Sequence, residues 1–290
     1  MKVGPGEAPH NGGDSSRAGG AVRHGLFLPP FDALASPDLL VELAIDAERS
    51  GWDGFFLWDH LKYGTRVRDI LDPYICLTAV AAATSTMELG VMVTPLVRRR
   101  PAVLARQAIT LDHVSHGRLV LGFGIGDDFA GELSSFGDEV DAKVRGRMLS
   151  EGLEVLTDLM SGEPVDHDGE FYRATDVRYL PVAARPGGVP VWLAARWPNP
   201  APLRRAAQYQ GVFVIGLTDP TDVAELRRRL RAAGADLAHF DIVVLGVIGD
   251  DVSTWDEAGV TWRLAQIGPF ELEISAAREL ILAGPPGRPR

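Results

Sequence analysis

Cysteine, lysine and net positive charge are all scarce in this sequence. Cys76 is the only cysteine among 290 residues, so no disulfide can form within the chain, and a reducing cytoplasm is the expected setting. Of the 29 basic residues only Lys2, Lys62 and Lys143 are lysines, and the formal net charge at pH 7 is −10. Nucleic acid and anionic membranes repel such an acidic chain, so neither is expected as a main partner.

Long hydrophobic runs are also missing. No apolar stretch approaches the ~18 residues that a membrane-spanning helix requires. Residues 1–20 are rich in Gly, Pro and Ser and lack the apolar core of a secretion signal, which predicts a disordered tail with nothing to bury. The chain as a whole has 46% hydrophobic residues and is long enough to build a sizeable core.

Several well-known catalytic signatures are absent. The sequence has no P-loop and no G-x-S-x-G nucleophile elbow. His113 and His116 could lie on one helix face, but no third ligand is evident nearby, so no metal site is predicted and a metal-dependent hydrolase is disfavoured. The glycines of GFGIGDD do not match the dinucleotide-binding pattern G-x-G-x-x-G, because Asp127 occupies its last glycine position; no Rossmann site is expected.

The sequence does contain short apolar strands that alternate with amphipathic helices. The clearest unit spans residues 87–128, where the strand MELGVMV leads through a basic loop to a helix and then to the strand RLVLGFG. Pro101 suits the first position of that helix, and Leu104, Ala108 and Leu111 give it one apolar face. Two continuously apolar strands joined by a helix of this length predict a parallel βαβ unit.

Eight such strands are predicted, and nearly all of them are separated by helices. They begin near residues 22, 52, 87, 118, 190, 211, 241 and 259. This count predicts a closed (β/α)8 TIM barrel of the α/β class, with a loop insertion after the fourth strand at residues 127–142 and a small hairpin before the fifth. An open doubly wound sheet is the alternative. The arginines at 98–100 are expected to form a solvated face.

In a barrel, the loops that follow the strands carry function. His60 directly follows the second strand, where an imidazole can donate a hydrogen bond or transfer a proton near neutral pH; a structural histidine is the alternative. Asp127 is a candidate proton partner, although a helix-capping or solvated loop acid fits the same pattern. Ala194 and Ala195 precede a helix start whose amides could bind a phosphate, unless the segment is a plain loop.

Taken together, these blocks resemble the bacterial luciferase-like monooxygenase superfamily, the flavin- or deazaflavin-dependent "LLM class" of oxidoreductases. The likeness is carried, in order, by ERSGWDGFFLWDHL, DPYICLTAVAAATSTMELGVMVTPL, RRRPAVLARQAITLDHVSHGRLVLGFGIGD, GEFY and VPVWLAA. It runs from about Val22 to Pro286. The resemblance implies a single TIM-barrel domain over residues 21–286, with a flavin-type ring held at the C-terminal ends of the strands.

The resemblance also implies roles for individual residues. His60 and Asp127 would be the catalytic pair, the histidine beside the hydride acceptor and the acid as its proton partner. A non-proline cis peptide would lie between Met92 and Val93, behind the ring. Gly64 stands where the sugar-phosphate dehydrogenases of this class have tryptophan, which disfavours a sugar-phosphate substrate. The implied cofactor contacts are Asp59, Met92, Val93, Thr94, Gly122, Gly124, Ala194, Ala195 and Arg196, the last three at the phosphate.

The predicted activity is hydride transfer between coenzyme F420 and a small organic substrate. FMN is the alternative cofactor; it would make the protein a monooxygenase that depends on a partner flavin reductase. A barrel that binds flavin without turnover is the alternative from another functional class. Family habit further suggests a homodimer.

Overall fold

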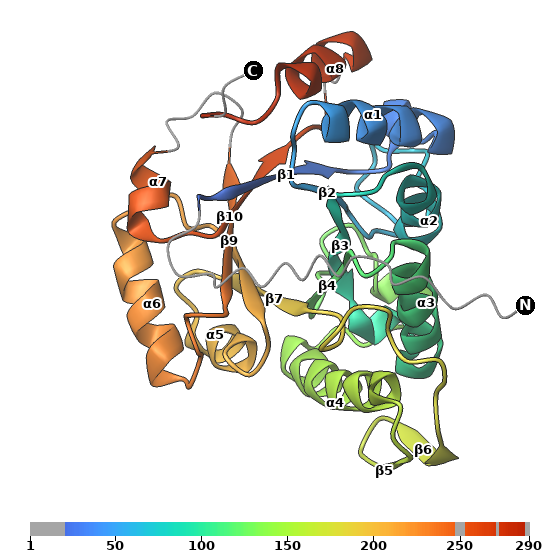
Figure 1. The fold of residues 1–290 in the computed structure, drawn as a ribbon. Helices are drawn as coiled ribbons and strands as arrows, with labels where there is room; N and C mark the ends of the chain where they lie inside the picture. The colour runs from blue at the N-terminus through green and yellow to red at the C-terminus, as the bar shows by residue number, and fades with distance from the viewer. Residues whose placement is uncertain (1–20, 247–252, 271–272, 288–290) are drawn as a thin grey trace, which may run out of the picture.

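The computed structural model describes residues 21–246, 253–270 and 273–287, and its centre is a closed barrel of parallel strands (Figure 1). The order around the barrel is β1-β10-β9-β8-β7-β4-β3-β2. The strands are β1 (Arg23–Leu28), β2 (Gly54–Leu57), β3 (Glu88–Pro95), β4 (Leu119–Gly124), β7 (Val191–Arg196), β8 (Gly211–Ile215), β9 (Asp241–Gly246) and β10 (Trp262–Gln266). Because β1 pairs with both β2 and β10, the sheet has no edge, and the predicted TIM barrel is confirmed.

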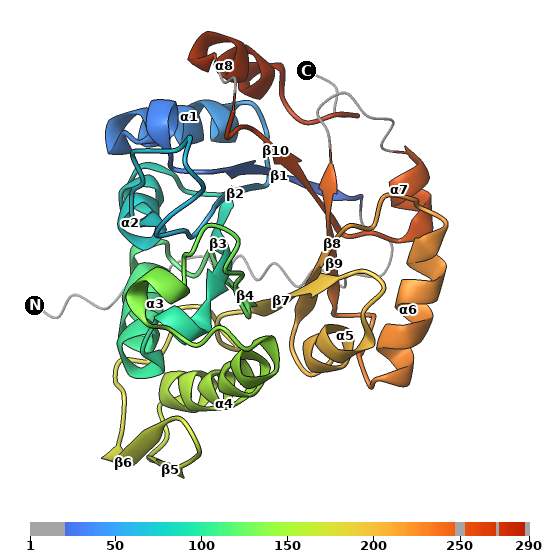
Figure 2. The same ribbon diagram turned by 180° about the vertical axis from the view of Figure 1, so that it is seen from behind.

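Helices surround the barrel on its outside (Figures 1 and 2). They are α1 (Pro37–Arg49), α2 (Pro73–Ala83), α3 (Pro101–Val114), α4 (Ala142–Ser161), α5 (Pro200–Ala206), α6 (Asp222–Ala232), α7 (Ser253–Ala258) and α8 (Ile274–Ala283), with short 3-10 turns η1 (Asp32–Leu34), η2 (Leu96–Arg98) and η3 (Ser134–Phe136). The last helix lies beside the first, where Arg278 Nε is 2.6 Å from Asp46 Oδ2. In the part of the chain that the structure describes, no helix is both long and apolar enough to cross a membrane.

The sequences Ser36-Pro37 and Asp72-Pro73 predict helix starts, and capping hydrogen bonds confirm both of them. Ser36 Oγ accepts from the backbone N–H of Leu39 at 3.3 Å, and Asp72 Oδ1 accepts from that of Ile75 at 3.0 Å. Each capping residue precedes a proline, whose fixed φ suits the first helical position and which has no N–H to leave unpaired. The sequence alone therefore determined where α1 and α2 begin.

Other helix ends are less well marked in the sequence. Asp219-Pro220 predicts a helix cap, but Asp219 does not cap α6, since its Oδ1 accepts from the N–H of Thr221 at 2.9 Å and the helix begins only at Asp222. Helix α7, between β9 and β10, has no clear signal in the sequence. The sequence also predicts a last amphipathic helix over residues 271–283; its first two residues, like the predicted tail at residues 1–20, lie outside the described residues.

The segment between β4 and β7 contains both predicted additions to the barrel. The loop insertion after β4 includes η3 and leads into α4. The antiparallel strands β5 (Val165–Asp168) and β6 (Arg173–Val177) then form the predicted hairpin, which projects beyond α4 (Figure 1). Both additions are confirmed.

Aromatic side chains fill the inside of the barrel. Phe56, Trp192 and Trp262 are fully buried, and their ring centroids lie 5.6–5.7 Å apart. Glycines on neighbouring strands make room for them; a Cβ on Gly25 of β1, for example, would lie 2.7 Å from Cε2 of Phe56. These rings close the barrel from below, so a ligand can reach the interior only from the C-terminal ends of the strands.

Candidate functional site

The loops after β2 and β4 meet at the mouth of the barrel through a histidine and a glutamate. His60 Nδ1 lies 2.9 Å from Glu132 Oε2, and only 6% of the glutamate side chain is exposed. Glu132 Oε1 also accepts from the backbone N–H of Leu61 at 2.6 Å and pairs with Arg98. This carboxylate is therefore held from three directions.

The charge of Glu132 determines which nitrogen of His60 remains available. Burial by itself would raise the pKa of Glu132, but the hydrogen bond with His60 and the charges of His60 and Arg98 hold it below its usual value of 4.5. An ionised carboxylate only accepts hydrogen bonds, so it assigns the proton to Nδ1 of the imidazole. Nε2 then has no hydrogen-bond partner among the described residues, and it can accept or donate a proton at the mouth.

Two arginines from the loop after β3 tie the neighbouring acids together. Arg98 Nη2 donates to the backbone oxygen of Asp59 at 2.7 Å, and Arg99 Nε and Nη2 donate to the two carboxylate oxygens of Asp59 at 3.0 and 3.1 Å. The side chains of Arg98 and Arg99 are 3% and 18% exposed, so the expected solvated arginine face is wrong for both of them and holds only for Arg100. The loops after β2, β3 and β4 form one connected network of charges.

The predicted acid partner of His60 lies elsewhere in the same loop. Asp127 is exposed, and its Oδ1 accepts from the N–H of Phe129 at 2.8 Å, which closes a local turn. Asp128 Oδ1 accepts from the N–H of Leu133 at 2.8 Å, and its backbone hydrogen bonds lower its pKa. The structure thus brings Glu132 to His60, and the catalytic role of Asp127 stays a prediction.

Small residues on adjacent strands form a floor at the mouth. Val93 and Ala194 are half-buried at the ends of β3 and β7. A Cβ on Gly124 would lie 3.0 Å from Cγ2 of Val93 and 3.5 Å from Cβ of Ala194, so a side chain at that position would fill the space. A cis peptide bond joins Met92 to Val93, at the position that the resemblance implies. This floor of Val93, Gly124 and Ala194 fits the flat face of a flavin-type ring.

Other residues in the predicted cofactor set have side chains turned away from this floor. Thr94 is fully buried, and its Oγ1 lies 2.8 Å from the hydroxyl of Tyr74 on α2. Ala195 packs in the core between the strands and the helices. Met92 and Gly122 contact each other inside the barrel, and the carboxylate of Asp59 is already paired with arginines. Cofactor contacts by these residues stay predictions.

The segment predicted to bind the phosphate of the cofactor runs from the end of β7 to the start of α5. Among the described residues it offers one unpaired cation and fewer unpaired backbone N–H groups than expected. Arg196 is exposed at the end of β7 and forms no ion pair within the described chain. Helix α5 has seven residues, and the N–H of Ala201 in its first turn already donates to Oδ1 of Asn199 at 3.2 Å. The expectation of uncapped helix amides is corrected, and Arg196 is the group that remains for an anion.

No metal site accompanies these residues. Across residues 21–246, 253–270 and 273–287, no three His, Cys, Asp or Glu side chains are placed so that they could hold an ion. His113 Nε2 instead lies 2.8 Å from the backbone oxygen of Val182.

Comparisons with known proteins show which family the chain resembles. A family model described as luciferase-like monooxygenase matches residues 9–251. The chain is 35% identical over 173 residues to an F420-dependent glucose-6-phosphate dehydrogenase of Mycolicibacterium smegmatis. This alignment covers 56% of this chain and 49% of that enzyme. It is 29% identical over 209 residues to a 5,10-methylenetetrahydromethanopterin reductase of Archaeoglobus fulgidus. Here the alignment covers 71% of this chain and 58% of the reductase. The chain thus spans about half the length of the curated relatives it matches.

One solved structure illustrates how far the likeness of fold extends. An F420-dependent secondary alcohol dehydrogenase in complex with an F420–acetone adduct superposes with a TM-score of 0.74. The superposition covers 91% of this chain and 99% of the other, at 18% sequence identity. This likeness concerns the fold.

Proposed function

We propose that this chain, which belongs to the luciferase-like monooxygenase family, transfers hydride between coenzyme F420 and a small organic substrate. The observation that carries the proposal is the pairing of His60 with Glu132 at 2.9 Å beside a floor of small residues. Relatives named for F420 and for reductase or dehydrogenase activity support it. Glu132, in place of Asp127, is the acid that we assign to His60.

In this proposal each group at the mouth has one task. When bound, the deazaflavin supplies a hydride acceptor or donor that disfavours one-electron chemistry with oxygen. Val93, Gly124 and Ala194 would bind its flat face, and Arg196 would bind an anionic group of its side chain. Nε2 of His60 takes the hydroxyl proton when an alcohol is oxidised and returns it when a carbonyl is reduced. Glu132 stabilises the imidazolium that forms, as a carboxylate does behind a catalytic histidine.

Titration of the purified protein with F420 and with FMN, followed by cofactor fluorescence, tests the proposal. We expect tight binding of F420 and a change in its absorbance when a hydride donor is added without oxygen. Tight binding of FMN alone would favour a monooxygenase with a partner reductase. Binding of F420 that no donor or acceptor ever reduces or oxidises would identify a non-catalytic carrier.

Gly124→Val tests whether the small-residue floor binds the ring. The added side chain projects into the space between Val93 and Ala194, so the Kd for F420 is expected to rise about 10–100-fold, the range that overpacking costs correspond to. Ala232→Val, on the exposed side of α6, is the matched control and should leave the Kd unchanged. A folded Gly124→Val protein with the wild-type Kd would remove the floor from the cofactor site.

Glu132→Gln tests the assigned acid by its pH dependence. The folded-state pKa of Glu132 lies below its usual 4.5, so its interactions stabilise the fold fully above that pH and are lost as the pH falls through the lower folded value. The wild-type melting temperature should therefore fall more steeply below pH 4.5 than that of the variant. At neutral pH, loss of the charged hydrogen bond should lower kcat about 10-fold. Parallel melting curves and equal kcat values would contradict the assignment.

We also propose that the protein works as a homodimer in the cytoplasm. The usual oligomeric state of the family supports the homodimer, and the single cysteine supports a reducing cytoplasm. A flavin reductase partner would be needed only if the cofactor were FMN.

A further inference from the structure

The guanidinium of Arg145 joins the two ends of the loop insertion that follows β4. Arg145 belongs to the first turn of α4 and is 5% exposed. Its Nε donates to the backbone oxygen of Ile125 at 2.9 Å, and its Nη2 lies 3.4 Å from that of Gly126. Its Nη1 donates to the backbone oxygens of Glu139 and Val140. Three nitrogens of one buried side chain therefore hold both the start and the end of the insertion.

The insertion has little else that fixes its position. Of residues 127–141 only Glu132 and Leu133 are buried. A loop with few buried contacts opens at a low cost in free energy, so its hydrogen bonds to the rest of the protein decide where it lies. Lys62 Nζ donates to Ser135 Oγ at 3.3 Å, but that contact is exposed to water and adds little. The buried hydrogen bonds of Arg145 and Glu132 do most to hold the insertion.

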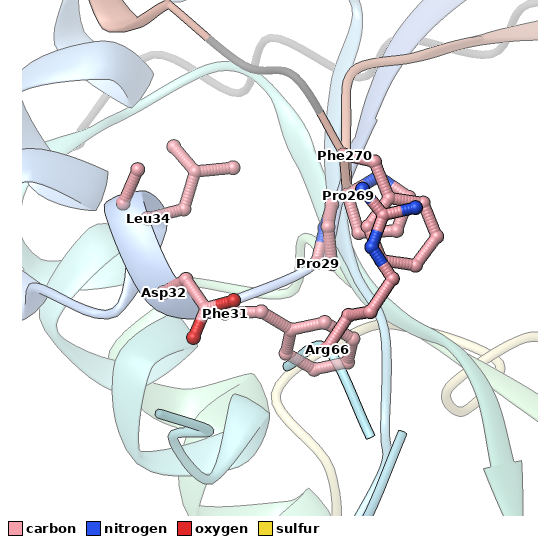
Figure 3. A pocket seen from close by; sticks show the side chains of 8 residues that line it. Pro29, Phe31, Asp32, Leu34, Arg66, Pro269 and Phe270 are labelled. Carbon is pink, nitrogen blue, oxygen red and sulfur yellow. The ribbon is translucent and has the colours of Figure 1, made fainter. Parts of the chain in front are cut away.

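Glu132 is the neighbour that fixes the orientation of the His60 ring. Its Oε2 lies 2.9 Å from Nδ1, and a hydrogen bond to a carboxylate is both strong and directional. Phe31, whose ring centroid lies 5.9 Å from that of the imidazole, lines a cavity of about 230 Å³ together with Phe270 and Arg66 (Figure 3). A ring that borders open space has no packing partner on that side, so it cannot hold the imidazole in place without Glu132.

From these contacts we infer that Arg145 is a positioning residue for catalysis: by joining the ends of the insertion, it keeps Glu132 within hydrogen-bond distance of His60. The inference rests on the proposed function, in which His60 transfers the proton. The cofactor floor does not depend on Arg145 in the same way, because Gly124 is held opposite Pro95 in the ladder of β3 and β4. Loss of Arg145 therefore acts on kcat and spares the binding of F420.

Amide hydrogen exchange in Arg145→Met tests the tie to Glu132 without any cofactor. The N–H of Leu61 donates to Glu132 Oε1 at 2.6 Å, so its exchange should become at least about 10-fold faster when Glu132 moves away. The N–H of Trp58, which donates to the backbone oxygen of Leu28 at 3.1 Å in the barrel, should exchange as in wild type. Unchanged exchange at Leu61, or equal acceleration at both amides, would overturn the inference.

Two further variants keep this test sharp. Arg145→Lys retains the positive charge but offers one nitrogen in place of three, so exchange at Leu61 should lie between the wild-type and Arg145→Met values. It takes over the test if Arg145→Met does not fold, and wild-type exchange in it would then overturn the inference. Arg147→Met is the matched control on the same helix, because Arg147 is 54% exposed and pairs with Glu170.

A double-variant cycle tests the consequence for catalysis. With the donor that reduces F420 in the titration above, Arg145→Met should lower kcat about 3–10-fold, no more than Glu132→Gln does, and leave the Kd for F420 within about twofold. Added to Glu132→Gln, it should lower kcat by less than about twofold, since residues of one network are not additive. Multiplied losses would overturn the inference. A protein that binds no F420 would overturn the proposed function, whereas exchange at Leu61 still judges the tie between Arg145 and Glu132.

Discussion

Replacing His60 with alanine is expected to lower kcat by about 10²–10⁴-fold, the range usual for loss of a general acid or base. Nδ1 of the imidazole is held by Glu132 at 2.9 Å, and Nε2 has no hydrogen-bond partner among the described residues. The Kd for F420 should stay within about twofold, because the floor of Val93, Gly124 and Ala194 is untouched. Anaerobic reduction of F420 by a hydride-donating substrate and a separate fluorescence titration give the two values.

His113→Ala is the matched control for that substitution. His113 is exposed on α3, and its Nε2 lies 2.8 Å from the backbone oxygen of Val182, so its loss should leave kcat unchanged. Wild-type kcat in His60→Ala together with weaker F420 binding would contradict the proton-transfer role and make His60 a binding residue.

Arg98→Met is expected to lower the free energy of unfolding by about 3–5 kcal/mol, the cost of breaking a buried ion pair by removing one partner. Methionine keeps much of the length and packing of the arginine stem but removes every donor. Glu132 and Asp59 are 6% and 1% exposed, so their charges would lose a partner without gaining water. Urea denaturation at pH 7 measures the difference.

Arg147→Met is the control that separates burial from charge. Arg147 pairs with Glu170 at 3.0 Å on the surface, with the two side chains 54% and 57% exposed, and exposed pairs of this kind contribute at most about 1 kcal/mol. Equal losses in the free energy of unfolding for Arg98→Met and Arg147→Met would contradict the larger cost expected for removing a buried partner.

The barrel could be predicted because its strands are buried on both faces. Such strands appear in sequence as continuous apolar runs, and β2 is an example, with all four of its residues buried. Proline and capping side chains then fixed the starts of α1 and α2. Helix α7 has only six residues, too few for an amphipathic period to stand out, and so it escaped prediction.

The pairing of His60 with Glu132 could not be predicted, because it joins loops that are distant in the chain. His60 and Glu132 are 72 positions apart, and Arg98 and Glu132 are 34 apart. Nothing in the spacing of single charged residues within loops indicates which of them will meet, so Arg98 was expected in solvent and Glu132 was not singled out.

The predicted cofactor contacts include neighbouring residues of one strand, whose side chains differ in direction. Consecutive residues of a strand point to opposite sides of the sheet. Ala194 and Ala195 therefore cannot both present side chains to the mouth, and the structure places Ala195 in the outer core. Alternation along β7 was the available signal that could have divided this pair in advance.

The closed base of the barrel also bears on the order of events in a catalytic cycle. Phe56, Trp192 and Trp262 fill the interior, so we expect cofactor and substrate alike to reach His60 from the C-terminal ends of the strands. In the proposed function the flavin-type ring lies on Gly124 and the substrate lies over that ring. We therefore expect an ordered mechanism in which the cofactor binds first and is released last.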